Sequence, residues 1–386
     1  MVRAAKVGSA KSTERIRRSR IPAASNSSGD GHVSKGEGRK LNGLDPILKV
    51  SEPWRRVIKG DARAIPLADG TVDLVVTSPP YWRKRDYGFK GQIGQEPSAA
   101  AYVEAVMACL AEWRRLLRPT GSVFLNIGDT FHERSLAGIP GRIEAAAGDD
   151  EWIVRNRIIW SKDGGMPEPA RNRLANRHEY VLHLAVKSSY YYDLFGYSTA
   201  MGNGANPGDV WRFNPERNMG DHLAPFPQEI VRRAILLACP QAVCNACGMP
   251  RGRIVQRTST LDTTRAQARR ALEIAKQAGL TKAHIQAIQA TGVSDAGKAL
   301  RIQNGTGRNS DEVKRLAGEA KAALGGYFRE FTFAKRQSVG WTTCGHRSGF
   351  APGVVLDPFM GTGTTLTTAL AMGRSAVGVD LAPPGT

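Results

Sequence analysis

The stretch Val354-Val-Leu-Asp357-Pro358-Phe359-Met360-Gly361-Thr362-Gly363-Thr364-Thr365 decides the fold. It predicts a buried strand that ends in an acid, then a glycine-rich turn and the start of a helix that Thr364 or Thr365 can cap. Glycines let the backbone approach a ligand closely. No lysine follows them and the acid would repel phosphate, so the turn is not a phosphate loop. It suits a zwitterionic, positively charged cofactor instead.

From Val57 onward, short β-branched runs alternate with amphipathic stretches. This alternation is typical of an α/β fold with a mostly parallel sheet. Helices are predicted over residues 99–117, where apolar side chains recur at helical spacing, and over residues 228–238. The predicted strands cover residues 56–58, 72–77, 122–127, 153–160, 180–186, 354–356 and 376–379.

A second motif, Asp73-Leu-Val-Val-Thr77-Ser78-Pro79-Pro80-Tyr81-Trp82, also places polar residues directly after a buried strand. The prolines stop the strand, so Ser78 lies at the carboxyl end of a parallel strand, where open α/β sheets bind their ligands. The Ser78 hydroxyl and the Pro79 carbonyl can accept hydrogen bonds from the two N–H groups of a nucleobase amine. Such acceptors expose the nitrogen lone pair to an electrophilic methyl. Tyr81 can stack on an extruded base.

Taken alone, Ser78-Pro79-Pro80-Tyr81 is also compatible with an ordinary proline-rich turn. With the glycine-rich turn, it resembles the catalytic motif of DNA amino-methyltransferases, and residues 357–365 match the S-adenosylmethionine loop of that family at every fixed position. The order of the two motifs is that of the β group, and the resemblance covers nearly all of residues 57–381. It implies a Rossmann-like methyltransferase fold with a mostly parallel seven-stranded sheet and a helical insert. It also implies base flipping and direct attack of the amino nitrogen on the methyl.

The resemblance implies the site residues as well. Asp380 ends the last predicted strand, where an acid can bind a ribose diol, and Asp61 follows the first strand, where it would face the adenine amino group. Each carboxylate can instead be a helix cap or a surface charge. The implied cofactor set is Asp61, Phe226, Asp357, Pro358, Phe359, Gly361, Gly363, Thr364 and Asp380, beside the catalytic residues Ser78, Pro79, Pro80 and Tyr81.

The composition favours a nucleic-acid partner. Among 386 residues the formal net charge is +19 and the pI is near 10.0, which is the electrostatic footprint expected for binding phosphates. An anionic membrane is the rival partner, but the sequence contains no apolar run long enough to span a bilayer and no signal peptide. Five cysteines are too few for a secreted disulfide scaffold. We therefore expect a soluble protein in the cytoplasm of a bacterial cell or a phage-infected host.

Four segments are predicted. Residues 1–43 form a basic disordered tail, which either adds phosphate contacts or is a solvated leader. The catalytic half (44–243) and the cofactor-binding half (347–386) flank a helical insert at 244–346, the candidate target-recognition region. Within it, residues 251–336 show no convincing strands, and helices at 265–278 and 281–290 predict either a helix-turn-helix or a small helical subdomain. Only six residues follow Asp380, so either the pocket is open there or the C-terminus is shortened.

Cysteine pairs bracket the insert. Cys244-x-x-Cys247 begins it and Cys344-x-His346 ends it, a spacing that suits tetrahedral structural zinc bound by three thiolates and one imidazole. The alternative is a set of unligated cysteines in a reduced protein. Cys109 and Cys239 are predicted to be core residues.

The sequence thus predicts site-specific methylation of double-stranded DNA with S-adenosylmethionine as the cofactor. Ser78 favours cytosine N4 as the target, since adenine-N6 enzymes usually carry Asp or Asn there, and adenine N6 is the alternative. A hypothesis of another class is a non-catalytic DNA-binding protein on a methyltransferase fold. We expect a monomer or homodimer, and the resemblance raises the prospect of a cognate restriction endonuclease as a partner.

Overall fold

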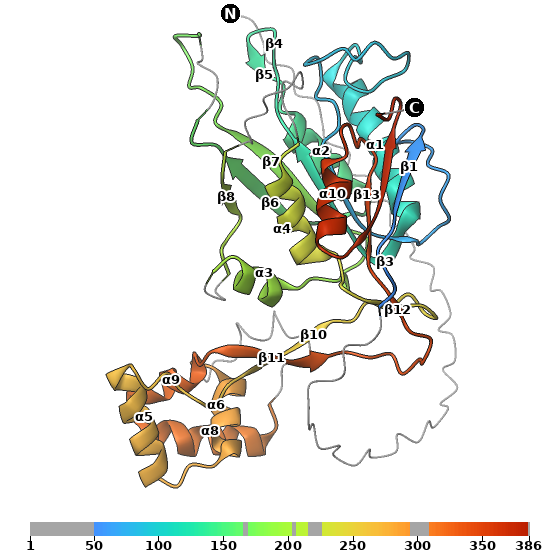
Figure 1. Ribbon diagram of the computed structural model, residues 1–386. Coiled ribbons are helices and arrows are strands. Elements are labelled where there is room, and N and C mark those ends of the chain that lie inside the picture. The colour runs from blue at the N-terminus through green and yellow to red at the C-terminus, as the bar shows by residue number, and fades with distance from the viewer. Residues whose placement is uncertain (1–49, 165–168, 203–205, 215–225, 294–308, 385–386) are drawn as a thin grey trace, which may run out of the picture. The chain divides into compact units, whose positions relative to one another are not determined.

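A central β-sheet with helices on both faces organises the protein (Figure 1). The structure is a computed structural model that describes residues 50–164, 169–202, 206–214, 226–293 and 309–384. The basic segment predicted at residues 1–43 lies outside this range. No helix in the described ranges is long and apolar enough to cross a membrane.

Eight strands form the main sheet in the part of the chain that the structure describes, and all but β7 run in the same direction. The α/β class and the mostly parallel sheet are therefore confirmed, and each of the seven predicted strands is present. The additional strand is β8, at the edge next to β6. In sheet order the strands are β1 (Arg55–Lys59), β14 (Ser375–Asp380), β13 (Val354–Asp357), β2 (Val72–Thr77), β3 (Leu117–Ile127), β7 (His178–Ala185), β6 (Ile153–Ser161) and β8 (Val210–Arg212).

The order of the strands brings the two sequence motifs together. The last two strands of the chain, β13 and β14, lie between β1 and β2, as the red and blue ribbons of Figure 1 show. The parallel β13 and β2 pair with Val355 opposite Leu74 and Leu356 opposite Val75. The carboxyl ends of the two strands therefore lie side by side. Ser78 follows one of these ends and the glycine-rich turn follows the other.

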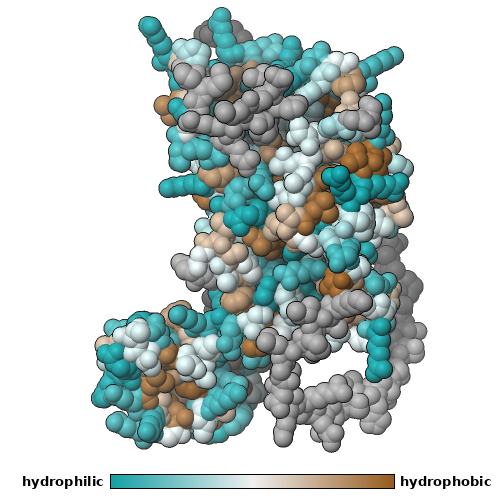
Figure 2. Space-filling model, viewed as in Figure 1, coloured by the Kyte–Doolittle hydropathy of each residue, from teal (hydrophilic) through white to brown (hydrophobic). Residues whose placement is uncertain are grey.

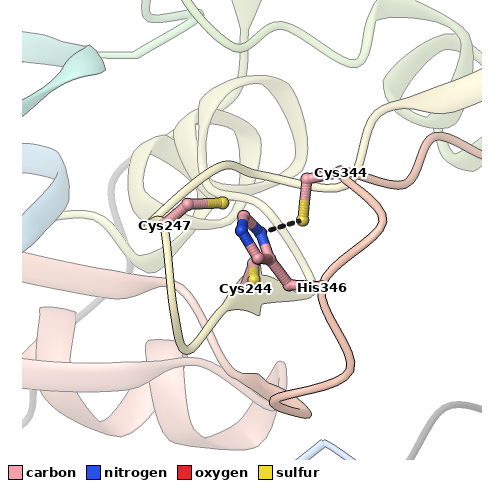
Figure 3. Close-up of side chains that lie close together, drawn as sticks. All are labelled: Cys244, Cys247, Cys344 and His346. Atoms are coloured by element: carbon pink, nitrogen blue, oxygen red, sulfur yellow. Dashed lines mark hydrogen bonds between the residues drawn. The ribbon is translucent and has the colours of Figure 1, made fainter.

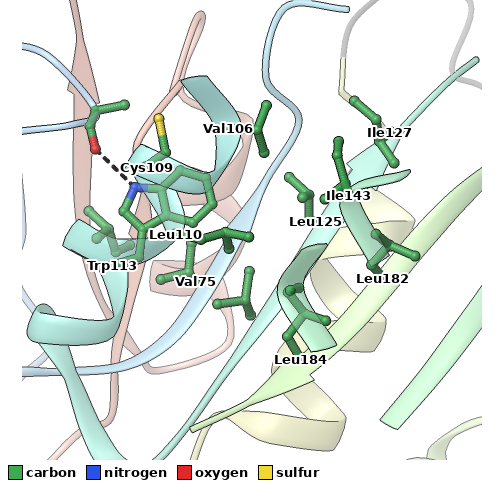
Figure 4. Close-up of a cluster of buried hydrophobic side chains, with 14 of the residues drawn as sticks. Val75, Val106, Cys109, Leu110, Trp113, Leu125, Ile127, Ile143, Leu182 and Leu184 are labelled. Carbon is green, nitrogen blue, oxygen red and sulfur yellow. Dashed lines mark hydrogen bonds between the residues drawn. The ribbon is translucent and has the colours of Figure 1, made fainter. Parts of the chain in front are cut away.

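Two hydrophobic cores cover the faces of the sheet. Helices α1 (Ala99–Leu116) and α2 (Ile139–Asp149) pack on one face, and Figure 4 shows part of that core around Trp113 and Val75. Helices α3 (Leu194–Ala200), α4 (Gln228–Ala238) and α10 (Thr364–Ala371) pack on the other. The cysteines predicted to be core residues, Cys109 and Cys239, are buried, one in each core.

Helix α1 shows how local sequence sets the element boundaries. The side chain of Ser98 accepts a hydrogen bond from the backbone N–H of Ala101, which caps the first turn. The helix ends at Leu116, close to the predicted end, and β3 begins at the next residue. This strand starts earlier than predicted because Leu117 pairs with Val72 of β2. The buried side chains of α1 recur at helical spacing and face the sheet.

The insert consists of a two-stranded ribbon and a helical subdomain. The ribbon pairs β10 (Arg253–Arg257) with β11 (Arg336–Trp341), so the prediction of no strands within residues 251–336 was wrong. The two strands lie about 80 residues apart in the chain, and the periodicity of a local segment does not reveal a pairing over that separation. The other short strand pairs are β9 (Val243–Cys244) with β12 (Phe350–Ala351) and β4 (Phe131–His132) with β5 (Ser135–Leu136).

The helical subdomain has its own small core. Gly279, at φ 62°, makes the turn between the two predicted helices, and Thr281 forms a capping box with His284 at the start of the second. Buried alanines and aliphatic residues, with Phe331, hold the helices together. The small helical subdomain is therefore present, and a helix-turn-helix role in DNA binding stays a prediction. Its elements are α5 (Ala266–Gln277), α6 (Lys282–Thr291), α8 (Asp311–Leu324), η1 (Gly325–Tyr327) and α9 (Phe328–Thr332).

Candidate active site

A cavity lies at the carboxyl ends of β1, β2, β13 and β14. Its empty volume is about 720 Å³, part of which is open to solvent. Residues predicted from both motifs line it, although they are almost 300 positions apart in the chain. From the predicted set these are Asp61, Ser78, Pro80, Pro358, Phe359, Gly361 and Asp380.

Asp357 lies behind the cavity wall and joins the two motifs by hydrogen bonds. Its buried carboxylate accepts hydrogen bonds of 2.6 Å from the hydroxyls of Thr77 and Thr365, and one of 3.1 Å from the backbone N–H of Phe359. Thr77 immediately precedes Ser78, and Thr365 lies in the first turn of α10. Asp357 does not line the cavity. It therefore positions the glycine-rich turn against the end of β2.

The start of α10 differs from the expectation. Neither Thr364 nor Thr365 is the cap: the helix begins at Thr364, the N-cap is Gly363 at φ 86°, and no side chain caps it. The prediction of a threonine cap was wrong because the hydroxyl of Thr365 donates to Asp357 instead. Gly363 occupies the left-handed region, which a side chain would disfavour.

Burial raises the pKa of the Asp357 carboxyl from 3.8 to about 6. The folded protein thus holds this proton more tightly than the unfolded chain, and this contribution to stability is present at low pH and lost as the pH rises from about 4 to above 6. The change corresponds to about 3 kcal/mol. We expect Asp357→Asn, which cannot titrate, to become more stable relative to the wild type by up to that amount between about pH 4 and pH 7. Urea unfolding at a series of pH values measures it, and a stability difference that stays constant with pH contradicts it.

Asp380 and Asp61 lie on the cavity wall in different electrostatic settings. The Asp380 carboxylate accepts from the backbone N–H groups of Gly361 and Ala382, both at 3.0 Å, which ties the end of β14 to the glycine-rich turn. Both oxygens of Asp61 are engaged by the Arg63 guanidinium, which holds the pKa of that carboxyl below its usual value. Asp61 therefore presents an ion pair to the cavity rather than a bare carboxylate.

A polar network surrounds the catalytic motif. The Ser78 hydroxyl donates to the Tyr81 hydroxyl at 3.4 Å, and the Tyr81 hydroxyl donates to the Glu179 carboxylate. The Asn126 amide donates to Tyr81 at 2.8 Å and to Glu179 at 3.0 Å. Lys162 forms an ion pair with the other oxygen of Glu179. The structure thus links Ser78 to a carboxylate on β7 and a cation at the end of β6.

Asn126, Glu179 and Lys162 were absent from the predicted site. Asn126 lies on β3, Glu179 lies on β7, and Lys162 directly follows β6, three strands that are consecutive in the sheet. The signal that could have identified them is a polar or charged residue in or beside an otherwise apolar strand. Their convergence depends on the antiparallel pairing of β7 with β3 and β6, which no local pattern reveals.

Tyr81 is partly buried, and its ring lies against the backbone of Gly128. A Cβ at position 128 would come within 2.6 Å of the Tyr81 Cε2 atom, so only glycine leaves room for the ring. Tyr81 and Pro79 do not line the cavity, although Ser78 and Pro80 do. Stacking of Tyr81 on a base stays a prediction.

The remaining predicted cofactor residues lie off the cavity wall. Phe226 is partly buried and packs against the core that contains α4, and neither Gly363 nor Thr364 lines the cavity. Their contribution to cofactor binding stays a prediction.

The four predicted metal ligands come together at the base of the insert (Figure 3). Each offers one ligand atom, and the four atoms all lie within 4.8 Å of one another. Cys244 is buried, whereas Cys247, Cys344 and His346 are exposed. Hydrogen bonds from the Ser348 hydroxyl and the Cys247 backbone lower the pKa of the Cys244 thiol to about 6.

A family model described as DNA methylase matches residues 72–242 and 350–383, which is more than half of the chain and includes both motifs. The chain belongs to the DNA methylase family. The match is interrupted where the insert begins and resumes where it ends, so the insert is an addition to the family core. The protein is a DNA amino-methyltransferase of the restriction-modification type, and its cofactor is S-adenosylmethionine.

Several type II methyltransferases are similar to this DNA methylase. M.Cfr9I of Citrobacter freundii is 32% identical over 226 residues, covering 49% of this chain and 75% of the relative. M.XycI of Xanthomonas campestris pv. cyanopsidis is 33% identical over 230 residues, covering 50% and 77%. Among solved structures, PvuII DNA methyltransferase (cytosine-N4-specific) matches with a TM-score of 0.48 and 13% identity, covering 88% of this chain and 86% of that one.

Proposed function

We propose that this DNA methylase transfers a methyl group to the N4 amino group of cytosine at specific sites in double-stranded DNA. The observation that carries the proposal is the position of Ser78. It lies on the wall of the cavity at the end of β2, in the acceptor position of the catalytic motif. Serine is typical of this position in enzymes of the family that methylate cytosine, whereas adenine enzymes usually carry Asp or Asn.

The direction of the hydrogen bonds supports an acceptor role for Ser78. Its proton is donated to Tyr81, the Tyr81 proton is donated to Glu179, and one Ser78 lone pair accepts from the Asn126 amide at 3.4 Å, which leaves the second lone pair for the base. An amino N–H of the target base can donate to that lone pair. The nitrogen gains a bond to the methyl and must release a proton. The Ser78–Tyr81–Glu179 chain offers a route for this proton to a carboxylate.

Lys162 and Asn126 keep this chain in place. Lys162 is 20% exposed and its ion pair with Glu179 orients one carboxylate oxygen, which leaves the other for Tyr81. Asn126 donates to both Tyr81 and Glu179. The two residues therefore position the groups that contact Ser78 and do not themselves reach the cavity.

The cavity suits the cofactor. S-adenosylmethionine, when bound, supplies an electrophilic methyl on a positively charged sulfonium. We assign its binding to the wall residues Asp61, Pro358, Phe359, Gly361 and Asp380, with Asp357 as a positioning residue. Asp380 presents a carboxylate at the end of a strand, where nucleotide-binding folds bind ribose hydroxyls. The apolar faces of Pro358 and Phe359 offer contact area to an adenine ring.

We assign target recognition to the insert. Residues 244–346 contain 17 Lys and Arg against 7 Asp and Glu, so the segment contributes strongly to the net charge of +19. Figure 2 shows mostly hydrophilic side chains over the helical part of the insert, around a small hydrophobic group. Positive charge of this kind neutralises DNA phosphates. The DNA partner implies a location in the cytoplasm. We further propose that the protein acts as a monomer or a homodimer and that a cognate restriction endonuclease is its partner.

The modified base is the direct test. We expect the purified full-length protein, given unmethylated genomic DNA and S-adenosylmethionine with a labelled methyl group, to produce N4-methylcytosine. Mass spectrometry of the hydrolysed nucleosides identifies the product. N6-methyladenine in place of N4-methylcytosine would contradict the cytosine assignment while leaving the DNA amino-methyltransferase activity intact. Mapping of the modified positions then gives the recognition sequence.

A further inference from the structure

A second site lies where the chain enters and leaves the insert, and it shares no residue with the cavity. Cys244 and Cys247 lie at the entry, and Cys344 and His346 lie at the exit. Figure 3 shows the four side chains turned toward one another, and the His346 Nδ1 atom is 3.3 Å from the Cys344 sulfur. Two segments separated by about a hundred residues thus present one set of soft ligand atoms.

The backbone holds both segments independently of any metal. Phe350 pairs with Cys244 in the short β9–β12 ladder. Asn245 bridges the segments twice, through its backbone N–H to the Gly349 carbonyl at 3.2 Å and through its side chain to the Ser348 carbonyl at 3.1 Å. The Gly248 N–H donates to the Cys244 carbonyl at 2.9 Å, and Gly248 has φ 68°. This turn directs both cysteines of the first pair to the same side.

The spacing of the ligand atoms fits a single zinc ion. Bonds of about 2.3 Å to sulfur and about 2.0 Å to nitrogen place tetrahedral ligand atoms about 3.5–3.8 Å apart. The observed limit of 4.8 Å therefore requires an inward shift of about 1 Å, which side-chain rotation can supply. Three thiolates and an imidazole are ligands that favour zinc over harder cations such as magnesium. A disulfide explains the arrangement less well, because it would leave the histidine and the third cysteine without a role.

We propose that Cys244, Cys247, Cys344 and His346 bind one structural zinc ion that clamps the base of the insert. Four protein ligands leave no open coordination position, so the zinc has no part in the methyl transfer. The family model omits residues 243–349, which contain all four ligands. The site thus belongs to the added segment. Its role is to fix the directions in which β10 leaves the core and β11 returns to it.

The first test uses the wild-type protein. We expect full-length protein purified without chelator to contain one zinc per chain by elemental analysis, with the zinc released when a mercurial reagent blocks the thiols. Cobalt exchanged into the site should show the visible absorption of tetrahedral Co²⁺ together with a thiolate charge-transfer band. A wild-type protein that contains no zinc and does not bind added zinc or cobalt would overturn the proposal.

Substitutions identify the ligands. Cys344→Ser and His346→Ala should lose the zinc, whereas His346→Cys should keep it, because a thiolate can replace the imidazole. Cys109→Ala is the matched control, since this buried cysteine lies in the core on α1 and should leave the zinc content unchanged. Equal zinc contents in His346→Ala and in the control would contradict the assignment.

The consequence for DNA binding rests on the proposed role of the insert. Zinc loss in His346→Ala should weaken DNA binding and leave the affinity for S-adenosylmethionine unchanged, and His346→Cys should restore DNA binding. Loss of zinc without any change in DNA affinity would argue against the recognition role of the insert and leave the metal site standing. Loss of cofactor affinity in His346→Ala, with recovery in His346→Cys, would contradict the claim that the zinc acts only on the insert and not on the cofactor cavity.

Discussion

Ser78→Ala is expected to lower kcat for methyl transfer by roughly 10²- to 10³-fold, the usual effect of removing one positioned hydrogen-bonding group from an active site. Ser78 lies on the cavity wall, and its hydroxyl donates to Tyr81 and accepts from the Asn126 amide, which leaves one lone pair for the base. Alanine removes this acceptor. The hydrogen bond between Gly361 and Asp380 on the cavity wall stays intact. Transfer of a tritiated methyl group to DNA measures kcat, and equilibrium binding measures the affinity for S-adenosylmethionine.

Ser135→Ala is the matched control for this substitution. Ser135 is exposed on β5, and its hydroxyl makes only a 3.4 Å contact with the Leu136 carbonyl among the interactions described. Its removal should leave both kcat and cofactor affinity unchanged. Unchanged turnover in Ser78→Ala would remove Ser78 from its proposed role. A loss of cofactor affinity equal to the loss of kcat would instead indicate that the substitution distorts the cavity.

Gly128→Ala is expected to lower kcat by roughly 10- to 10²-fold, because displacing an active-site group by about 1 Å can reduce the rate of the reaction by that much. The added Cβ would lie 2.6 Å from Cε2 and 2.9 Å from Cδ2 of Tyr81. The ring cannot retreat freely, since its hydroxyl is hydrogen-bonded to Glu179 and Asn126. The substitution therefore shifts Tyr81 and, through it, Ser78. Steady-state kinetics at saturating cofactor measures the effect.

Gly141 and Tyr81 provide the controls for this experiment. Gly141 lies in α2 with open space around it, so Gly141→Ala should leave kcat unchanged and preserve or slightly raise the stability. A double-mutant cycle tests the mechanism directly. The atoms nearest the added Cβ all belong to Tyr81, so Gly128→Ala should have little further effect once Tyr81→Ala has removed the ring. Additive effects of the two substitutions would refute the steric explanation.

Asp357 has a role in the proposed mechanism that the sequence motif alone does not reveal. The sequence suggested that the acid of the glycine-rich turn suits a positively charged cofactor. In the structure this carboxylate is buried, and its hydrogen bonds go to Thr77, Thr365 and Phe359. It therefore joins the two sequence motifs and does not line the cavity. Any change that loosens Asp357 should affect cofactor binding and catalysis together.

The sequence by itself determined the class of fold, the family and seven of the sixteen residues that line the cavity. The buried strands that end just before Ser78 and at Asp357 were visible as apolar runs stopped by proline, because local sterics and hydrophobicity set those boundaries. The four candidate zinc ligands were also recognisable, because their spacing within each pair is short and characteristic. Each of these motifs and each ligand pair is local, so a single short stretch of chain is enough to recognise it.

Only the tertiary structure decided what lies between and behind these motifs. Asn126 reaches Ser78 and Tyr81, Glu179 reaches Tyr81, and Lys162 reaches Glu179, because β3, β7 and β6 are neighbours in the sheet. The pairing of β10 with β11 and the convergence of the four candidate zinc ligands likewise join segments about 80 to 100 residues apart. Strand pairing and burial are collective, since each depends on partners distant in the chain, and local residue patterns therefore do not specify them.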